Sequence, residues 1–230
     1  MIEEPVRTTD FVLARLERRT LQRLAAALPA WMVPDHLTLI GIFGSTLVGA
    51  GYLLSNRNED WLLLACLGLA INWFGDSLDG TLARYRRIER PRYGFYLDHL
   101  TDAYSTIAIG VGLGLSPYML VAVGLTIVVA YLVLSINVYL ETHAFGRFTF
   151  SYGWFGPTEM RIMLVLLNLA ALFFGPLAFP LLGIRFTIFD LAGLAIVAAM
   201  TMLLAGRVVG NLRTLAALEP ARRSADEVSE

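Results

Sequence analysis

The amino-acid sequence predicts an all-α, polytopic membrane protein with six transmembrane helices, preceded by an N-terminal amphipathic helix at the membrane interface. Composition is the first reason: 57% of the residues are hydrophobic and 16% are charged, whereas a soluble domain is usually about half apolar and about a quarter charged. The second reason is a series of six apolar stretches. The third is a bias of arginine towards one side of these stretches.

Residues 10–28 predict the amphipathic helix. Five leucines recur there near helical spacing, and arginines fill much of the rest of the segment. Such a helix suits the membrane surface, with its arginines towards lipid phosphates. An ordinary solvated helix packed on the domain is the alternative. Acidic residues interrupt the first 30 positions, so we expect no signal peptide there.

Each of the six apolar stretches is close to the ~20 residues that a bilayer-spanning helix needs. Their approximate limits are 36–54, 61–84, 95–115, 118–141, 157–179 and 187–210. We therefore expect three parts: a cytoplasmic amphipathic segment (1–35), a six-helix transmembrane domain (36–211) and a polar cytoplasmic tail (212–230). The single cysteine, Cys66, excludes a disulfide within the chain.

The distribution of arginine predicts the orientation. With six spans, the two termini and the loops at 84–94 and 142–156 share one side, and sixteen of the eighteen arginines fall on that side. The other side has only Arg57 and Arg185. The positive-inside rule then places both termini in the cytoplasm. Because the basic residues are spread over several loops, we expect no nucleic-acid partner.

Four aspartates stand where an apolar span should exclude them. Asp76 and Asp79 are three residues apart near the cytoplasmic end of the second span, and Asp98 and Asp102 are four apart near the start of the third. Each pair occupies one face of its helix. A short basic loop joins the two helices, so we expect an antiparallel hairpin in which the pairs face each other.

Four carboxylates in that space would repel one another strongly. Ionisable groups inside a span are costly and are by default functional. Carboxylate oxygens are hard ligands, which suits Mg²⁺, Mn²⁺ or Ca²⁺, and two metals about 3.5–4 Å apart are the usual arrangement for displacement at phosphorus. Small residues at Gly80, Ala83 and Gly94 would let a bulky substrate approach, and Arg84 offers a planar fork to a phosphate. Helix capping or pairing with neighbouring arginines is the structural alternative.

The pattern Asp76-x2-Asp79-Gly80-x2-Ala83-Arg84, followed by Gly94-x3-Asp98-x3-Asp102, resembles the signature of the CDP-alcohol phosphotransferases, also called CDP-alcohol phosphatidyltransferases. Every fixed residue of that signature is present. The six-span plan and the amphipathic N-terminal helix are also similar to this family. The resemblance implies a multi-pass enzyme of the cytoplasmic membrane that joins two alcohols through a phosphodiester and releases CMP, in phospholipid biosynthesis.

The resemblance also implies roles for the signature residues. Asp76, Asp79 and Asp98 would hold two divalent cations, Mg²⁺ or Mn²⁺, with Asp102 completing the metal site and serving as the first candidate for general base. Gly80, Ala83 and Gly94 would leave room for the cytidine, and Arg84 would neutralise phosphate charge. The partners would be a CDP-linked alcohol, an acceptor alcohol or diacylglycerol, and the lipid bilayer. The oligomeric state stays open, a homodimer included.

Two branches of the family differ in which substrate carries the CDP. Asp98-His99 looks more like the branch that joins a CDP-aminoalcohol to diacylglycerol. The alternative is a CDP-diacylglycerol-dependent enzyme that acts on glycerol phosphate, inositol or serine. His99 would take part in proton transfer or, in the interpretation that we favour, would make one hydrogen bond away from the aspartates.

Three further residues have interpretations that the sequence leaves open. Asp35, in a segment similar to the family's Pro-Asn-x-x-Thr element, is expected to cap the first span. Glu159 and Arg161 open the fifth span and would cap it or shape specificity for the acceptor.

Two classes of protein are alternatives to an enzyme. One is a transporter, in which the carboxylates mark an ion path, and the other is a catalytically idle scaffold.

Overall fold

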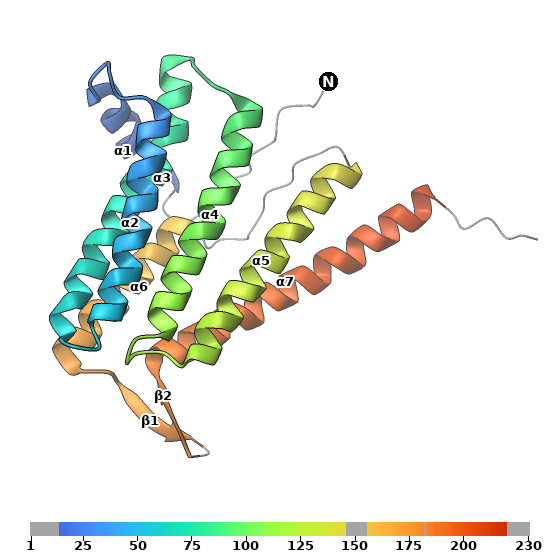
Figure 1. Ribbon diagram of the computed structural model, residues 1–230. Coiled ribbons are helices and arrows are strands. Elements are labelled where there is room, and N and C mark those ends of the chain that lie inside the picture. Colours follow the sequence, from blue (N-terminus) through green and yellow to red (C-terminus); the bar gives the residue numbers. More distant parts are fainter. Residues whose placement is uncertain (1–13, 146–155, 182, 220–230) are drawn as a thin grey trace, which may run out of the picture.

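The computed structural model describes residues 14–145, 156–181 and 183–219, most of which lie in long helices (Figure 1). The helices are α1 (Ala14–Ala27), α2 (Pro34–Leu54), α3 (Leu62–Arg86), α4 (Pro91–Gly114), α5 (Val121–Phe145), α6 (Pro157–Phe174) and α7 (Ile188–Leu218), with a 3-10 turn at Glu59–Trp61. Strands β1 (Ala178–Leu181) and β2 (Ile184–Thr187) form one antiparallel hairpin. Proline opens α2, α4 and α6, where its missing N–H costs no hydrogen bond.

Five of the described helical segments are long and apolar enough to cross a membrane: 34–54, 59–86, 121–145, 157–174 and 188–218. The prediction of an all-α polytopic membrane protein is therefore confirmed. Helix α4 takes the place of the third expected span and has 24 residues, but it is not among the five. Its first half carries Asp98, His99 and Asp102, which lower its hydropathy. The count of six spans stays a prediction.

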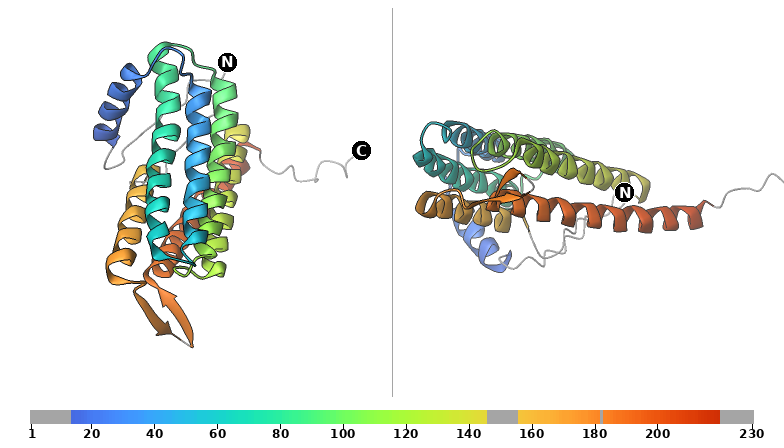
Figure 2. Two further views of the ribbon diagram at one scale, coloured as in Figure 1. Left: turned by 60° about the vertical axis from the view of Figure 1, so that its left-hand side comes forward. Right: turned by 90° about the horizontal axis from the view of Figure 1, so that it is seen from below.

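Helix α2 lies between α3 and α4 and packs against both (Figure 2). The expected hairpin, with α3 directly against α4, was wrong, and the reason is the glycine content of α2. A Cβ on Gly44 would lie 2.3 Å from the backbone nitrogen of Asn72 on α3, and one on Gly49 would lie 2.8 Å from the carbonyl oxygen of Ala108 on α4. These contacts leave no space for side chains, so α2 fits between its two neighbours with backbone close to backbone.

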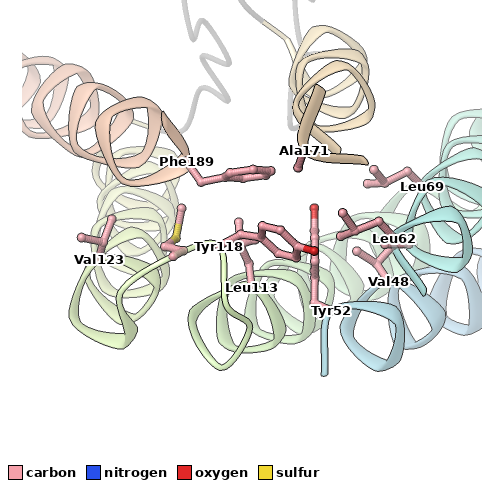
Figure 3. Packing of buried hydrophobic residues seen from close by; sticks show 11 residues of the cluster. Val48, Tyr52, Leu62, Leu69, Leu113, Tyr118, Val123, Ala171 and Phe189 are labelled. Carbon is pink, nitrogen blue, oxygen red and sulfur yellow. The ribbon is translucent and has the colours of Figure 1, made fainter. Parts of the chain in front are cut away.

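We call the end of the bundle where α2 and α4 begin and α3 ends the aspartate end, and the opposite end the hairpin end. At the hairpin end, buried side chains from α2, α3, α6 and α7 converge, among them Tyr52, Leu62 and Phe189 (Figure 3). The Tyr52 hydroxyl donates to Asn168 Oδ1 at 3.1 Å. Both side chains are fully buried among apolar residues, so this hydrogen bond between α2 and α6 supplies polar groups that water does not reach with a partner.

Asp190 is fully buried near the start of α7. Its Oδ2 accepts the backbone N–H of Thr187 at 2.8 Å and its Oδ1 accepts that of Leu120 at 2.7 Å. The carboxylate therefore caps α7 and ties it to the segment between α4 and α5. It serves the fold at the hairpin end and does not extend the acidic groups of the aspartate end, which a pathway across the bilayer would require.

Helices α5 and α7 are joined by a buried polar cluster around Glu141. Its carboxylate accepts Arg207 Nη2 at 2.6 Å and Arg207 Nε at 3.0 Å, and also the side-chain amides of Asn137 and Asn211 at 2.6 Å each. The bidentate pair and the two amides give both carboxylate oxygens of Glu141 a donor. Glu141 of α5 therefore links this helix to α7.

Helix α1 forms within the predicted segment and packs its Leu21 and Ala25 against Leu78 and Leu82 of α3. Its Glu17 accepts Trp73 Nε1 of α3 at 2.8 Å and the Thr158 hydroxyl of α6 at 2.5 Å. Residues 10–13 of the predicted helix lie outside the described residues. Its position on a membrane surface stays a prediction.

The last two spans differ from their expected limits. Helix α6 ends at Phe174 rather than near 179, because Gly175 has a positive φ of 73° and Pro176 follows. The apolar residues after it form β1 of the hairpin. Helix α7 continues to Leu218, beyond the expected limit at 210.

Candidate active site

The four aspartates lie at the aspartate end, two on α3 and two on α4. Asp79 of α3 is within electrostatic range of Asp76 and Asp98, and Asp102 of α4 is within range of the other three carboxylates. All four side chains are partly buried. Their negative charges therefore act on one another in a region where water screens them little.

Asp79 is held by α2. The Thr38 hydroxyl donates to Asp79 Oδ2 at 2.7 Å, and the backbone N–H of Gly80 approaches Asp79 Oδ1 at 2.5 Å. Both carboxylate oxygens thus have a donor. Thr38 is the threonine of the segment around Asp35 that is similar to the family's Pro-Asn-x-x-Thr element. The sequence did not indicate its contact with Asp79.

Asp76 is held by α6. Arg161 Nη2 donates to Asp76 Oδ2 at 2.5 Å, and Arg161 Nε donates to Asn72 Oδ1 at 2.9 Å. Asn72 in turn donates to the carbonyl oxygen of Gly41 at 3.0 Å. A chain of hydrogen bonds therefore joins α6, α3 and α2 at the first aspartate. The sequence placed Arg161 on this side of the membrane but did not indicate its partner, which is 85 residues away.

The second pair, Asp98 and Asp102, lies on α4. His99, which follows Asp98, faces α5. His99 Nδ1 is 2.7 Å from the carbonyl oxygen of Phe95 and 4.0 Å from Asp98 Oδ2. Its ring lies 5.2 Å from the ring of Tyr139 on α5. Tyr139 is also within electrostatic range of Asp98 and Asp102. It is therefore a neighbour of the site that the sequence did not indicate.

A small recess opens among the three helices at this level. Residues of α2, α3 and α4 line it: Thr38, Gly41, Ile42, Asn72, Asp76, Thr101 and Ser105. Most of its lining is polar, because three residues with a hydroxyl, one amide and one carboxylate contribute to it. The recess therefore places one signature aspartate beside groups that can donate and accept hydrogen bonds.

The small signature residues lie at the rim of the site. A Cβ on Gly94 would meet no atom within 4 Å, and one on Gly80 would come 3.3 Å from Nη1 of Arg84. Arg84 is exposed and its Nη2 is 3.4 Å from the Thr81 hydroxyl. The backbone at Gly94 is thus open to a ligand, and at Gly80 a guanidinium faces it.

The donor chemistry of the aspartates fits divalent cations such as Mg²⁺ or Mn²⁺, since all four supply hard anionic oxygens. A cation, the guanidinium of Arg161, already balances Asp76. In the described ranges, no three histidine, cysteine, aspartate or glutamate side chains converge closely enough to hold a metal without moving. The contacts of Asp76 with α6 and of Asp79 with α2 direct these carboxylates towards other helices.

Two expectations near the site can be checked against the structure. Asp35 does not cap α2: the cap position is Val33, and Asp35 forms an ion pair with Arg90, at the start of α4. The guanidinium of Arg90 also lies 3.9 Å from the centre of the Tyr93 ring. Glu159 does cap α6, because its Oε2 accepts the backbone N–H of Gly156 at 3.0 Å.

Comparison with known proteins decides the family. The model of the CDP-alcohol phosphatidyltransferases matches residues 31–205, which include α2 to α6 and most of α7. The chain belongs to the CDP-alcohol phosphatidyltransferase family. The matched region contains both aspartate pairs and also Thr38, Asn72 and Arg161, so the contacts described above lie in the family's own domain.

Two curated proteins are similar to part of the chain. The chain is 36% identical over 91 residues to cholinephosphotransferase 1 of Homo sapiens and to that of Bos taurus. Each match covers 37% of this chain and 22% of the relative. The chain thus spans about a fifth of the length of these curated relatives.

Proposed function

We propose that this protein catalyses the metal-dependent transfer of a substituted phosphate from a CDP-linked alcohol to the hydroxyl of a second alcohol, with release of CMP, in phospholipid biosynthesis. The observation that carries the proposal is the placement of Asp76, Asp79, Asp98 and Asp102 at one end of the bundle, within electrostatic range of one another. Membership of the CDP-alcohol phosphatidyltransferase family supports the general type of reaction.

The four aspartates would hold two Mg²⁺ or Mn²⁺ ions, with Asp102 completing the set. When bound, these cations would neutralise the diphosphate and stabilise CMP as a leaving group. Arg84 would add a positive charge at the phosphates. Gly80, Ala83 and Gly94 would leave room for the cytidine, which the open space at Gly94 supports.

Asp102 would act as general base, since a carboxylate partly buried among other carboxylates can accept a proton. It would take the proton of the acceptor hydroxyl, the acceptor oxygen would bond to the phosphorus that carries the donor alcohol, and the bond from that phosphorus to CMP would break. The negative charge that leaves with CMP balances the proton held by Asp102.

For the substrates, we propose a CDP-aminoalcohol as donor and diacylglycerol as acceptor. The Asp98-His99 sequence and the partial similarity to proteins named cholinephosphotransferase support this choice. The packing of His99 on Tyr139 gives it one clear role, positioning α4 against α5. The alternative is a CDP-diacylglycerol-dependent phosphatidyltransferase that acts on a soluble alcohol.

The test is an assay of the purified, reconstituted protein. Labelled CDP-choline, CDP-ethanolamine and CDP-diacylglycerol would each be offered with diacylglycerol, glycerol phosphate, inositol and serine. We expect CMP release and labelled lipid with a CDP-aminoalcohol and diacylglycerol, silenced by EDTA and restored by Mg²⁺ or Mn²⁺ better than by Zn²⁺. Product with CDP-diacylglycerol alone would favour the alternative branch, and no CMP release with any pair would refute the reaction.

A further inference from the structure

In the contact between Arg161 and Asp76, a guanidinium occupies a carboxylate that a divalent metal cation would also bind. Asp76 is one of the four carboxylates to which we assign a metal, yet its Oδ2 is bound at 2.5 Å by the guanidinium of Arg161. The side chain of Arg161 is 14% exposed and that of Asp76 is 22% exposed. An ion pair so little exposed to water is stronger than one at a surface.

Arg161 is also oriented for this contact. Its Nε bonds to Asn72, and Asn72 bonds to the backbone of Gly41, so two helices fix the plane of the guanidinium. Its third nitrogen, Nη1, is buried and has no hydrogen-bond partner among the described residues. The fork is therefore held by two of its three nitrogens, and Asn72 can keep Arg161 in place when Asp76 turns away.

We propose that Arg161 is the counter-ion of Asp76 and competes with a divalent cation for this carboxylate. The inference rests on the metal-dependent function proposed above. Before Asp76 can coordinate a cation through Oδ2, Arg161 has to release that oxygen. Arg161 thus sets the affinity of the site for metal. While Asp76 is not bound to metal, the positive charge of Arg161 also reduces the electrostatic repulsion among the four aspartates.

The expected size follows from the competition. If the paired form is populated about ten times more than the open form, the apparent metal affinity is about tenfold lower than the intrinsic one. Arg161→Gln removes the competitor, so it should bind Mn²⁺ about tenfold more tightly than the wild type. Arg161→Lys keeps the charge but loses the fork and the bond to Asn72, so its affinity should lie in between.

The measurement is Mn²⁺ binding to the purified protein, followed by the electron paramagnetic resonance signal of free Mn²⁺. Arg207→Gln is the matched control, because Arg207 is equally buried, at 15% exposure, and pairs with Glu141 at 2.6 Å outside the aspartate cluster. We expect Arg207→Gln to bind Mn²⁺ like the wild type. Size-exclusion profiles and thermal unfolding would show that each variant is folded.

The outcomes separate this inference from the proposed function. Unchanged or weaker Mn²⁺ binding by Arg161→Gln, with binding still dependent on Asp79 and Asp98, overturns the competition and leaves the metal site standing. Tighter binding by Arg161→Gln with wild-type affinity in Arg161→Lys supports the competition and shows that the positive charge at position 161 is sufficient for it without the planar fork. If the wild type binds no Mn²⁺, both the inference and the metal-dependent function fail.

Discussion

The hydroxyl of Thr38 on helix α2 donates a 2.7 Å hydrogen bond to Asp79 on helix α3, across 41 residues of sequence. The contact exists because glycines bring the two helices together backbone to backbone. It fixes which way the second signature carboxylate points. The precision of the site therefore comes from α2 as much as from the two helices that carry the aspartates.

Replacing Asp79 or Asp98 by asparagine should abolish transfer while the protein stays folded in detergent. An amide of the same size keeps the packing but loses the anionic oxygen that a hard cation requires. Single-turnover transfer of a labelled CDP-alcohol is the measurement. Asp60→Asn, at an exposed position before α3, is the control and should be fully active. Activity above a few per cent in either signature variant, at ordinary Mg²⁺ or Mn²⁺ levels, would contradict the metal assignment.

Asp102→Asn should separate the two roles proposed for this residue. If it is the general base, binding of metal and CDP-substrate should stay within a few fold, and transfer should fall by ~10²–10⁴, the usual range for such a group. If it is mainly a ligand, binding and transfer should fall together. Calorimetry of the CDP-substrate beside single-turnover kinetics distinguishes these results. A variant that binds and turns over normally would refute both roles.

Gly44→Ala should destabilise the bundle and loosen the site. The new Cβ would lie 2.3 Å from the backbone nitrogen of Asn72, so α2 and α3 would have to separate. Overpacking of this kind typically costs about 1–3 kcal/mol, measurable by denaturant or thermal unfolding in detergent. Gly210→Ala on α7 is the control, since its Cβ meets no atom within 4 Å, and alanine favours a helix over glycine by about 1 kcal/mol. Equal stability of the two variants would show that the close contact at Gly44 does not contribute to the free energy of unfolding.

The aspartate end should face the cytoplasm. A cysteine at the exposed position Glu89, between α3 and α4, should react with an impermeant thiol reagent in inside-out vesicles only. The background would be Cys66→Ser, because Cys66 is the single native cysteine. Labelling of intact cells from outside would reverse the orientation. Arg57→Cys, in the turn at the opposite end of α2, is the complementary control and should react from outside.

The sequence was sufficient for the helices whose ends carry clear signals. Helices α2 to α5 lie within a few residues of the expected limits, because prolines and charged turns separate these apolar stretches. The β hairpin was missed because residues 170–181 are apolar almost throughout, so Gly175-Pro176 was read as part of a span. Hydropathy alone does not mark the end of an apolar helix when the residues that follow it are also apolar.

The aspartates of the site were predictable, but most of their partners were not. A fixed spacing on two helices is visible in one sequence, whereas the contacts of Thr38, Asn72 and Arg161 join residues 31 to 89 positions apart. The position of α2 between α3 and α4 could not be predicted from the sequence either. It depends on close contacts between glycines of α2 and the backbones of α3 and α4, which exist only in the packed structure.

The hydrogen bonds of Glu17 make helix α1 a mechanical brace. One carboxylate oxygen receives Trp73 of α3 and Thr158 of α6 together, and three residues after Thr158 comes the arginine that holds Asp76. A displacement of α1 from the bundle would therefore act on the first turn of α6 through Thr158 and on α3 through Trp73. Through Arg161, the position of α1 is thereby linked to the first signature aspartate, Asp76.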